Sequence, residues 1–549
     1  MVFHLDFHFS YCRHIYLCMM ERSETYKLFI FYTNNYLIIL SPHMHSCFVI
    51  VKNFNFLNLY IVKLYHVEYN EIRFAQEGVF SMETNIVRLE QIEIHNIKNV
   101  AYGKINLATG DYQYNEKGSI LGIYGQNGSG KTVVVDVMVL LKALLSGKKI
   151  PDAFLQFIRY GEKEAFVRYR FHVKTENARH QFEYEVHLLK EADRHLVISL
   201  EQLSQKNLDT DSSRRLTPVF RYVRGGKSLF TPIASFRYFE KRLEDMVSLS
   251  VAHQLSESFN DEKQLPEITS FLFSAKAQEV FSKAKGDPYK IYQVSSVLQR
   301  FGRDYLAVIE NAHYGLLALN LTTIPMNMKW PASLAGSMSG VMVRLTDVNI
   351  LPKELFPYFE SNIKQINIVL GSLVPDLKLE IYHPFDKLME DGSDGIQFEL
   401  ISIRGQSRIP LLYESAGIKK LISICSNLVC CYNQESYCLV VDELDSGIYE
   451  YLLGEYLQAV QEEAKGQLIF TSHNLRPLEV LERNYLIYTT VNPDNRYSRT
   501  NYIKNTQNKR LSYMRTIKLG GQKEKFYQDT SLYEIELAFK EAGRVGIND

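Results

Sequence analysis

The amino-acid sequence predicts an α/β fold built on a mixed sheet. Short apolar runs typical of buried strands alternate with longer segments of helical periodicity. One apolar run, residues 119–124, passes through a glycine-rich turn into a largely apolar helical segment, residues 132–145. Pro266, Gly286 and Pro288 interrupt the helical pieces in the middle of the chain, so no heptad repeat and no long coiled coil is expected.

The composition excludes several other classes of protein. Of the 549 residues, 46% are hydrophobic and 23% are charged, which excludes a disordered or collagen-like chain. The 62 lysines and arginines equal the 62 aspartates and glutamates, so the net charge points to neither a nucleic-acid nor an anionic-membrane partner. The 7 cysteines include no Cys-x-x-Cys pair, which argues against a zinc site and fits a reducing cytoplasm.

Residues 1–81 differ from the rest of the chain. Gly78 is their only glycine among 29, although folded chains need turns. Asparagines and Lys52 interrupt their apolar stretches, so no membrane span is expected. Residues 76–78 can be written in codons that contain a ribosome-binding sequence shortly before Met82. We therefore expect a non-native or disordered extension with translation starting at Met82; a species-specific extension that packs on the body is the alternative.

From Met82 onward the apolar pattern predicts two lobes separated by an insertion. We expect an N-terminal lobe over 82–203, a mostly helical insertion and connector over 204–340, a C-terminal lobe over 341–490, and a basic segment with a C-terminal helix over 491–549. The predicted strands are 87–97, 119–124, 165–173, 182–189, 196–203, 377–383, 395–404, 439–441 and 467–471. The predicted helices are 132–145, 275–285, 290–310, 357–370, 415–429 and 449–463.

The turn after strand 119–124 matches the phosphate-loop pattern G-x-x-x-x-G-K-[ST] in full. Glycines let successive backbone N–H groups point at an anion, and the following helix places its positive end at the same point. Lys131 is expected to reach the β- and γ-phosphates of a nucleotide, and the Thr132 hydroxyl to bind Mg²⁺. The nucleotide-binding residues that the pattern predicts are Gly125, Asn127, Gly128, Ser129, Gly130, Lys131 and Thr132.

A second apolar strand ends in two carboxylates, Asp442 and Glu443. Asp442 stands at the strand tip and suits Mg²⁺ coordination together with Thr132, because hard cations prefer oxygen ligands. Glu443 follows it, where it could orient or polarise an attacking water. Two acids after a strand are by themselves typical of a solvated loop, but beside a phosphate loop they indicate nucleotide hydrolysis. Asp442 follows Thr132 by 310 residues (442 − 132), so the predicted site is discontinuous in sequence.

Further segments flank this acidic strand. Ser415 and Gly417 lie at the start of the preceding helix, Asp445 follows the strand, and His473 follows strand 467–471. In the order phosphate loop, signature turn, Asp-Glu strand, dimer-loop aspartate and switch histidine, the chain resembles an ATP-binding-cassette (ABC) type P-loop ATPase. The resemblance is to the soluble branch of structural-maintenance-of-chromosomes heads and overcoming-lysogenisation-defect ATPases, including stand-alone ATP-binding proteins of bacterial anti-phage systems. It implies a discontinuous ATPase head made of the two lobes.

This resemblance also implies roles for individual residues. It assigns Ser415 and Gly417 to contacts with the γ-phosphate that the other subunit holds, and Asp445 to the dimer loop. It implies a homodimer or higher homo-oligomer, closed around ATP and Mg²⁺. Gln156 is a candidate for the glutamine that the family places before the signature. The expected catalytic residues are Glu443, Lys131 and His473.

The end of the chain offers no recognisable effector. Related nucleases carry a metal-dependent nuclease domain after the switch histidine, whereas 76 residues (549 − 473) follow His473 here. Residues 501–528 are basic, which predicts a solvated face or a contact with a phosphate backbone or an acidic partner. A capping box opens the C-terminal helix. Its apolar stripe, expected to pack on its own head, comprises Leu532, Ile535, Phe539 and Ala542.

The sequence thus predicts a cytoplasmic ATP hydrolase without membrane segments that controls a separately encoded effector, in anti-phage defence. The first alternative is a DNA-repair or recombination ATPase, which would lose salt-dependent DNA binding when Lys509, Arg510 and Arg515 are neutralised. The second alternative is a nucleotide sensor that does not hydrolyse ATP. The neighbouring open reading frames would discriminate the biological roles, because a nearby nuclease favours defence and a repair operon favours the first alternative.

Overall fold

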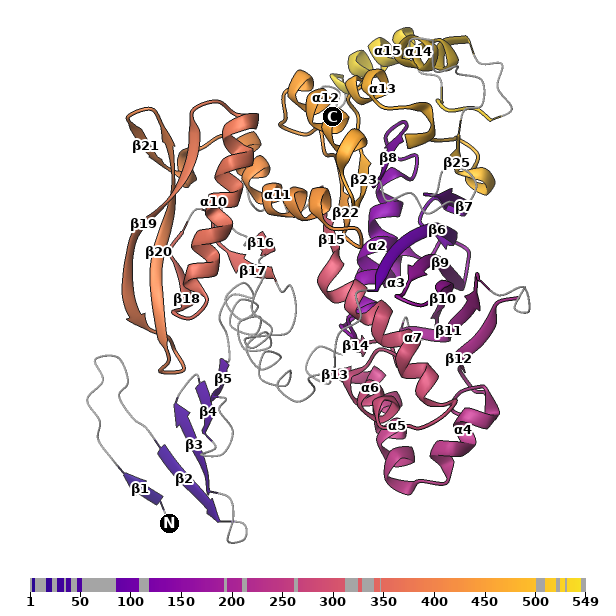
Figure 1. Cartoon of the computed structure of the whole chain (residues 1–549), viewed down its shortest axis with the longest axis vertical. Helices are drawn as coiled ribbons and strands as arrows, with labels where there is room; N and C mark the ends of the chain where they lie inside the picture. Colours follow the sequence, from indigo (N-terminus) through magenta and orange to yellow (C-terminus); the bar gives the residue numbers. More distant parts are fainter. Residues whose placement is uncertain are drawn as a thin grey trace. The chain divides into compact units, whose positions relative to one another are not determined.

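Figure 1 shows the computed structural model of the chain, in which several sheets combine with helices. By internal contacts the chain divides into two compact units, one of Met1–Ser81 with Pro331–Gly336, the other of Met82–Trp330 with Ser337–Asp549. The structure describes residues 2–4, 16–21, 27–33, 36–40, 47–51, 85–107, 118–191, 195–209, 215–260, 265–311, 324–327, 340–345, 347–499, 509–519, 524–528 and 531–544.

The first unit contains a five-stranded antiparallel sheet in which each strand pairs with the next along the chain. This order is a β-meander. Its strands are β1 (Val2–His4), β2 (Tyr16–Glu21), β3 (Lys27–Thr33), β4 (Tyr36–Leu40) and β5 (Cys47–Val51). Translation from Met82 stays a prediction, which peptides from residues 1–81 in the natively expressed protein would contradict by mass spectrometry.

The second unit is built on a six-stranded, mostly parallel sheet in the order β15-β22-β23-β8-β24-β25. Strands β22 and β23 are buried along their whole length, as expected of parallel strands covered on both faces. Only β25 runs antiparallel to its neighbour, so the sheet is mixed as predicted. The strands are β8 (Ser119–Tyr124), β15 (Leu306–Ile309), β22 (Cys438–Val441), β23 (Gln467–Thr471), β24 (Leu486–Thr489) and β25 (Tyr497–Ser498).

Helices cover both faces of this sheet. Cys438 and Val440 of β22 pack in one cluster with α2, while Leu439 and Val441 pack in another with α11 and α12. The alternation follows from the two-residue period of a strand. The predicted helices 132–145, 415–429 and 449–463 are confirmed as α2 (Lys131–Leu145), α11 (Ala416–Asn433) and α12 (Glu450–Glu463).

A second, antiparallel sheet covers α2 from the other side, in the order β12-β11-β10-β9-β6-β7. Val167, Tyr169 and Phe171 of β9 enter the same core as α2, and the Tyr169 hydroxyl donates to the Val137 carbonyl at 2.5 Å. Its strands are β6 (Ile86–Ile97), β7 (Val100–Asn106), β9 (Glu164–Lys174), β10 (Arg179–Lys190), β11 (Leu196–Asn207) and β12 (Thr217–Val223).

The helical region after β12 returns to the central sheet. The predicted helix 290–310 is wrong in its second half, because α7 ends at Arg300, a π-helical turn η2 (Phe301–Tyr305) follows, and β15 pairs in parallel with β22. Non-local strand pairing overrides the local helical pattern here. The other elements are α3 (Phe154–Phe157), α4 (Ile233–Glu240), α5 (Leu243–Ser256), β13 (Glu257–Asn260), β14 (Leu265–Ile268), α6 (Ala275–Ser282) and α7 (Tyr289–Arg300).

Before α11 in the chain, one helix packs on a third sheet and forms a separate hydrophobic core. Helix α10 buries Phe359, Ile363, Ile366 and Leu370 against an antiparallel sheet in the order β18-β20-β19, with β21 pairing β20. Predicted strand 377–383 is longer in the structure, ending at Leu388. The elements are β16 (Ile324–Asn327), β17 (Gly340–Val343), β18 (Asn349–Pro352), α10 (Phe356–Leu373), β19 (Leu377–Leu388), β20 (Asp394–Arg404), β21 (Ser407–Pro410) and η3 (Leu411–Tyr413).

The C-terminal helix α15 is capped as predicted, since the Ser531 hydroxyl accepts from the Glu534 N–H at 3.4 Å. The expectation that its apolar stripe packs on its own head is wrong, because Leu532 is 72% and Phe539 77% exposed. In the described part of the chain no helix exceeds the 18 residues of α10 and α11, and none is long and apolar enough to cross a membrane. The remaining elements are α13 (Arg476–Val480), η4 (Arg483–Tyr485), η5 (Pro493–Asn495), α14 (Lys509–Leu519) and α15 (Leu532–Ala542).

Candidate functional site

The phosphate loop connects β8 to α2 in a conformation that requires glycine. Gly128 and Gly130 have φ angles of 72° and 97°, in the left-handed region that side chains disfavour. Side chains of β24 and β25 form hydrogen bonds with the loop. The Thr489 hydroxyl donates to Ser129 Oγ at 2.5 Å, and the Tyr497 hydroxyl donates to the Gly130 carbonyl at 2.8 Å. These two bonds attach the loop to the neighbouring strands.

Lys131 folds back over this loop. Its Nζ donates to the carbonyls of Gly125 at 2.9 Å and Gln126 at 3.0 Å, and the residue is 6% exposed. Burial lowers the pKa of the Lys131 ammonium, while the nearby carboxylates of Asp442 and Glu443 counteract this shift. Lys131 Nζ therefore lies between backbone carbonyls and carboxylates. The oxygens of a bound triphosphate could replace the two carbonyls as its hydrogen-bond acceptors.

Asp442 and Glu443 follow the buried strand β22 and are tied to β23 by one hydroxyl group. Thr471 Oγ1 donates to Asp442 Oδ1 at 2.6 Å and accepts from the Glu443 N–H at 2.7 Å. Asp442 is 4% and Thr471 1% exposed, so both are shielded from bulk water. Thr471 therefore fixes the Asp442 carboxylate and the Glu443 backbone at the carboxyl end of the sheet.

Glu443 has a strained backbone and is held at every polar group. Its φ of 47° lies in the left-handed region, which costs a non-glycine residue about 1–3 kcal/mol and is typical of functional sites. Its carbonyl accepts from Lys420 Nζ at 2.6 Å and from the Ser446 N–H at 2.9 Å. Its carboxylate accepts from Asn311 Nδ2 at 2.8 Å and lies 3.7 Å from His473 Nε2.

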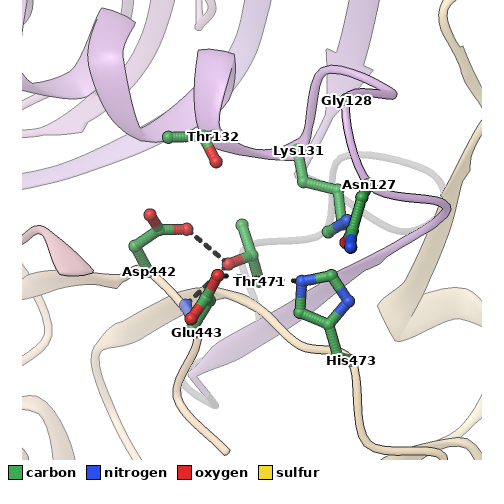
Figure 2. A pocket seen from close by; sticks show the side chains of 8 residues that line it. All are labelled: Asn127, Gly128, Lys131, Thr132, Asp442, Glu443, Thr471 and His473. Carbon is green, nitrogen blue, oxygen red and sulfur yellow. Dashed lines mark hydrogen bonds and ion pairs between the residues drawn. The ribbon is translucent and has the colours of Figure 1, made fainter. Parts of the chain in front are cut away.

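These residues enclose one polar cavity of about 460 Å³ (Figure 2). Of the predicted site residues, seven line it together with Thr471, whereas Gly125, Ser129 and Gly130 belong to the loop without lining the cavity. Gln156 is exposed on α3 and does not line the cavity either. The lining residues are Asn127, Gly128, Lys131, Thr132, Asp442, Glu443, Thr471 and His473.

The donor set in the cavity fits Mg²⁺. Thr132 supplies a hydroxyl and Asp442 a carboxylate on facing walls, and in Figure 2 both side chains point into the same space. Mg²⁺ is usually bound by one or two such protein oxygens, with water and substrate phosphates completing its shell. Among the described residues no group of three or more His, Cys, Asp or Glu side chains could hold a metal ion alone.

Asp445 contacts the turn after β23 directly. The Asp445 carboxylate accepts from the backbone N–H groups of His473, at 3.2 and 3.3 Å, and of Asn474 at 3.0 Å. The turn after β22 thus fixes the turn after β23, which presents the His473 ring, 41% exposed, to the cavity. Asp445 acts on the cavity through His473 and does not line it.

Ser415 and Gly417 lie at the surface, outside the cavity. Ser415 is the exposed N-cap of α11, and its hydroxyl accepts from the Ile418 N–H at 3.3 Å. Gly417 lies against the backbone of Gly447, and a methyl group there would overlap the Gly447 carbonyl oxygen. The turn before α11 and the turn after β22 are therefore in direct backbone contact.

Three residues of the site were not assigned from the sequence. Thr471 was recognised only as the end of a buried strand, Lys420 only as part of the signature helix, and Asn311 falls beyond the wrongly predicted helix. A hydroxyl at the end of a buried strand beside two acids was an available signal for Thr471. Asn311 carried no such signal, because its contact with Glu443 depends on β15 pairing with β22.

Two of the basic residues near the C-terminus contact the unit to which they belong. Arg510 pairs with Glu479 at 3.2 Å and with Glu450 at 3.6 Å, and Lys509 Nζ donates to the Leu481 carbonyl. Residues 501–508 and 520–523 of the predicted basic segment lie outside the described part of the chain. Lys509 and Arg510 thus attach α14 to the rest of the unit.

No protein family matches the chain by sequence, and no curated protein matches it. Among solved structures it is similar to the SMC head domain from Thermotoga maritima, with 12% identity, 75% of this chain and 99% of that chain covered, and a TM-score of 0.29. It is similar to the Smc head with an extended coiled coil bound to the C-terminal domain of ScpA from Pyrococcus furiosus (12%, 75% and 96%, 0.34). It is also similar to the recombination mediator RecF with ATP (13%, 71% and 94%, 0.30). At these identities the likeness concerns the fold alone and assigns neither family nor function.

Proposed function

We propose that this chain is an ATP-binding and ATP-hydrolysing ABC-type ATPase. The observation that carries the proposal is the one cavity in which Lys131 and Thr132 face Asp442, Glu443 and His473. A phosphate loop at a helix N-terminus favours a bound polyphosphate. Carboxylates on the opposite wall supply the metal ligand and water-orienting group that phosphate transfer to water requires. The volume of about 460 Å³ is in the usual range for small-molecule sites.

Each side chain has a distinct part in the proposed reaction. Lys131 exchanges its two loop carbonyls for β- and γ-phosphate oxygens of ATP. Mg²⁺ held by Thr132 and Asp442 would neutralise charge on the same phosphates. Glu443 orients a water for in-line attack on the γ-phosphorus, and the bond from this phosphorus to the β–γ bridging oxygen breaks to leave ADP and phosphate. His473 donates to the γ-phosphate.

A second copy of the chain completes the site in this proposal. Ser415 and Gly417 are accessible beside the dimer loop, and an α-helix begins there with its positive end outward. Such an end suits the γ-phosphate of an ATP bound to another copy. The proposed assembly is a homodimer, or a higher homo-oligomer, with two ATP–Mg²⁺ between heads.

Substitution of two site residues tests the hydrolysis proposal. Glu443→Gln should lower kcat at least about 100-fold while ATP still binds, because the carboxylate that orients water is lost. Lys131→Ala should abolish ATP binding or turnover. Steady-state phosphate release and binding of a fluorescent ATP analogue measure both. Wild-type turnover in Lys131→Ala would refute the assigned site, and unchanged turnover in Glu443→Gln would favour the non-hydrolysing sensor.

The biological role in the proposal is control of a separately encoded effector in anti-phage defence. It follows from the resemblance of the sequence motifs to stand-alone ATPases of defence systems. The DNA-repair alternative draws no support from Lys509 and Arg510, because these cations contact the chain's own carboxylates and carbonyl. A nuclease gene beside this one would support the defence role, and a repair operon would overturn it.

A further inference from the structure

A buried lysine of α11 connects this helix to the turn after β22, which contains Glu443. Lys420 lies five residues after Ser415, and its Nζ donates to the Glu443 carbonyl at 2.6 Å. Only 3% of Lys420 is exposed. We propose that Lys420 is a positioning residue that couples the signature turn to Glu443, and this inference rests on the proposed ATPase function.

Two opposing effects act on the ammonium of Lys420. The carboxylates of Asp442, Glu443 and Asp445 face it from the turn after β22 and favour the charged form. Burial has the larger effect and lowers its pKa to about 8, which is still above neutral pH. A charged donor in a shielded place makes a stronger hydrogen bond to a carbonyl than a neutral one does.

The bond acts on the one residue of the site whose backbone is strained. At a φ of 47° the Glu443 backbone returns to a relaxed conformation unless its neighbours hold it. Lys420 Nζ holds the carbonyl together with the Ser446 N–H, while Thr471 Oγ1 holds the N–H at 2.7 Å. Rotation of this peptide would swing the carboxylate away from the position that Asn311 and His473 define. Lys420 therefore sets where the water-orienting group points.

This geometry connects two different nucleotides. In the proposed dimer Ser415 touches the ATP held by the other copy, whereas Glu443 serves the ATP of its own copy. Lys420 lies five positions after Ser415 along α11, about 7.5 Å along the helix axis. A shift of α11 when the second ATP arrives is thus transmitted through Lys420 to Glu443. Hydrolysis in one cavity then depends on occupancy of the other.

The experiment measures steady-state ATP hydrolysis by the purified full-length chain. Lys420→Met should lower kcat at least about tenfold and leave KM for ATP within about twofold, because Glu443 acts in the transition state and not in ATP binding. Lys420→Arg keeps a charged donor and should recover kcat to within about threefold of wild type. The matched control is Lys419→Met, which removes a neighbouring lysine that is 4% exposed and donates to the Leu412 carbonyl at 2.8 Å, away from the cavity.

Three results would overturn the coupling: wild-type kcat in Lys420→Met, no recovery in Lys420→Arg, or an equal loss in Lys419→Met. If Lys420→Met does not fold, Lys420→Gln replaces it, and equal kcat in the Gln and Arg variants would overturn the proposal. If only the coupling is wrong, the wild-type chain still hydrolyses ATP, and Lys131→Ala still abolishes this hydrolysis. Absence of such hydrolysis in the wild-type chain would overturn both the coupling and the proposed function.

Discussion

Thr471 shows how much of the site depends on a single atom. Its hydroxyl oxygen contacts both acidic residues, as donor to Asp442 and as acceptor for the Glu443 N–H. Because all three residues lie at the ends of two neighbouring strands, this bridge fixes the metal ligand relative to the water-orienting group. A rearrangement of β23 would therefore displace both the proposed metal ligand and the proposed water-orienting group.

Thr471→Val should damage activity and stability together. The variant keeps the shape of the side chain but leaves a buried carboxylate and a backbone N–H without their partner, which costs about 1–3 kcal/mol of unfolding free energy. We expect kcat to fall about tenfold or more, since misplacing a catalytic group by 1 Å can cost up to about 100-fold. Thr471→Ser keeps the hydroxyl and should stay within about threefold of wild type in ATP hydrolysis assays; a loss equal to that of Thr471→Val would contradict the bridge.

At this scale the sequence predicts residues whose role follows from local spacing. Lys131 and Thr132 were found because a phosphate loop is contiguous, and Asp442 because it ends an apolar strand. Asn311 was not found, because only non-local pairing brings β15 beside β22 and the asparagine to Glu443. The role of Lys420 depends on the packing of α11 against the turn that contains Glu443. No residue spacing in the sequence predicts this packing.

Among the elements, η2 and β15 form the least expected connection. A continuous helix was predicted over 290–310, but the chain leaves α7 at Arg300 and becomes the edge strand of the central sheet. The turn is close to α2, since a methyl group on Gly302 would overlap the Leu145 side chain. Gly302 is thus a site of close packing between η2 and α2.

Gly302→Ala should destabilise the second unit. The added methyl group has to displace α2 or the π-helical turn, and overpacking of this kind costs about 1–3 kcal/mol. Gly371→Ala in α10 is the matched control, because its Cβ meets nothing within 4 Å. That control should be stabilising by about 0.5–1 kcal/mol, as alanine is the better helix former. Urea unfolding midpoints measure both, and equal midpoints would contradict the close packing at Gly302.

Helices and strands, like single residues, are predictable where the local sequence determines them and not where distant contacts do. Strands such as β22 and β23 were predicted because burial on both faces requires an unbroken apolar run. The cap of α15 was predicted from Ser531, whereas its packing was not, because an apolar stripe alone does not say what covers it. Local chemistry determines where an element begins, and tertiary contacts determine where it lies.

At the scale of the whole molecule, the proposed cycle needs two copies. The cavity lined by Lys131 and Glu443 contains neither Ser415 nor Gly417, although both are surface residues in the same unit. In the proposed assembly, one copy thus contributes two different surfaces to nucleotide binding. Assembly head to tail would use both parts in each of two equivalent sites.

Ser415→Arg should separate nucleotide binding from assembly. The bulky cation obstructs the surface that a second copy is proposed to approach, but it lies outside the cavity that binds ATP. We expect ATP affinity within about threefold of wild type and loss of the ATP-dependent dimer. Analytical ultracentrifugation in a Glu443→Gln background, where ATP should persist, measures the dimer. A full dimer in the double variant would refute the proposed interface.

The position of β8 also has a consequence for synthesis on the ribosome. Residues 119–124 emerge early, yet both neighbours of this strand come from residues 467–471 and 486–489. At translation rates of about 5–20 residues per second, roughly 20–70 s pass before either neighbour is made. Throughout that interval the nascent chain carries an unpaired apolar strand, and its phosphate loop lacks the contacts with Thr489 and Tyr497. A fragment that ends before residue 467 therefore exposes both edges of β8, which favours aggregation.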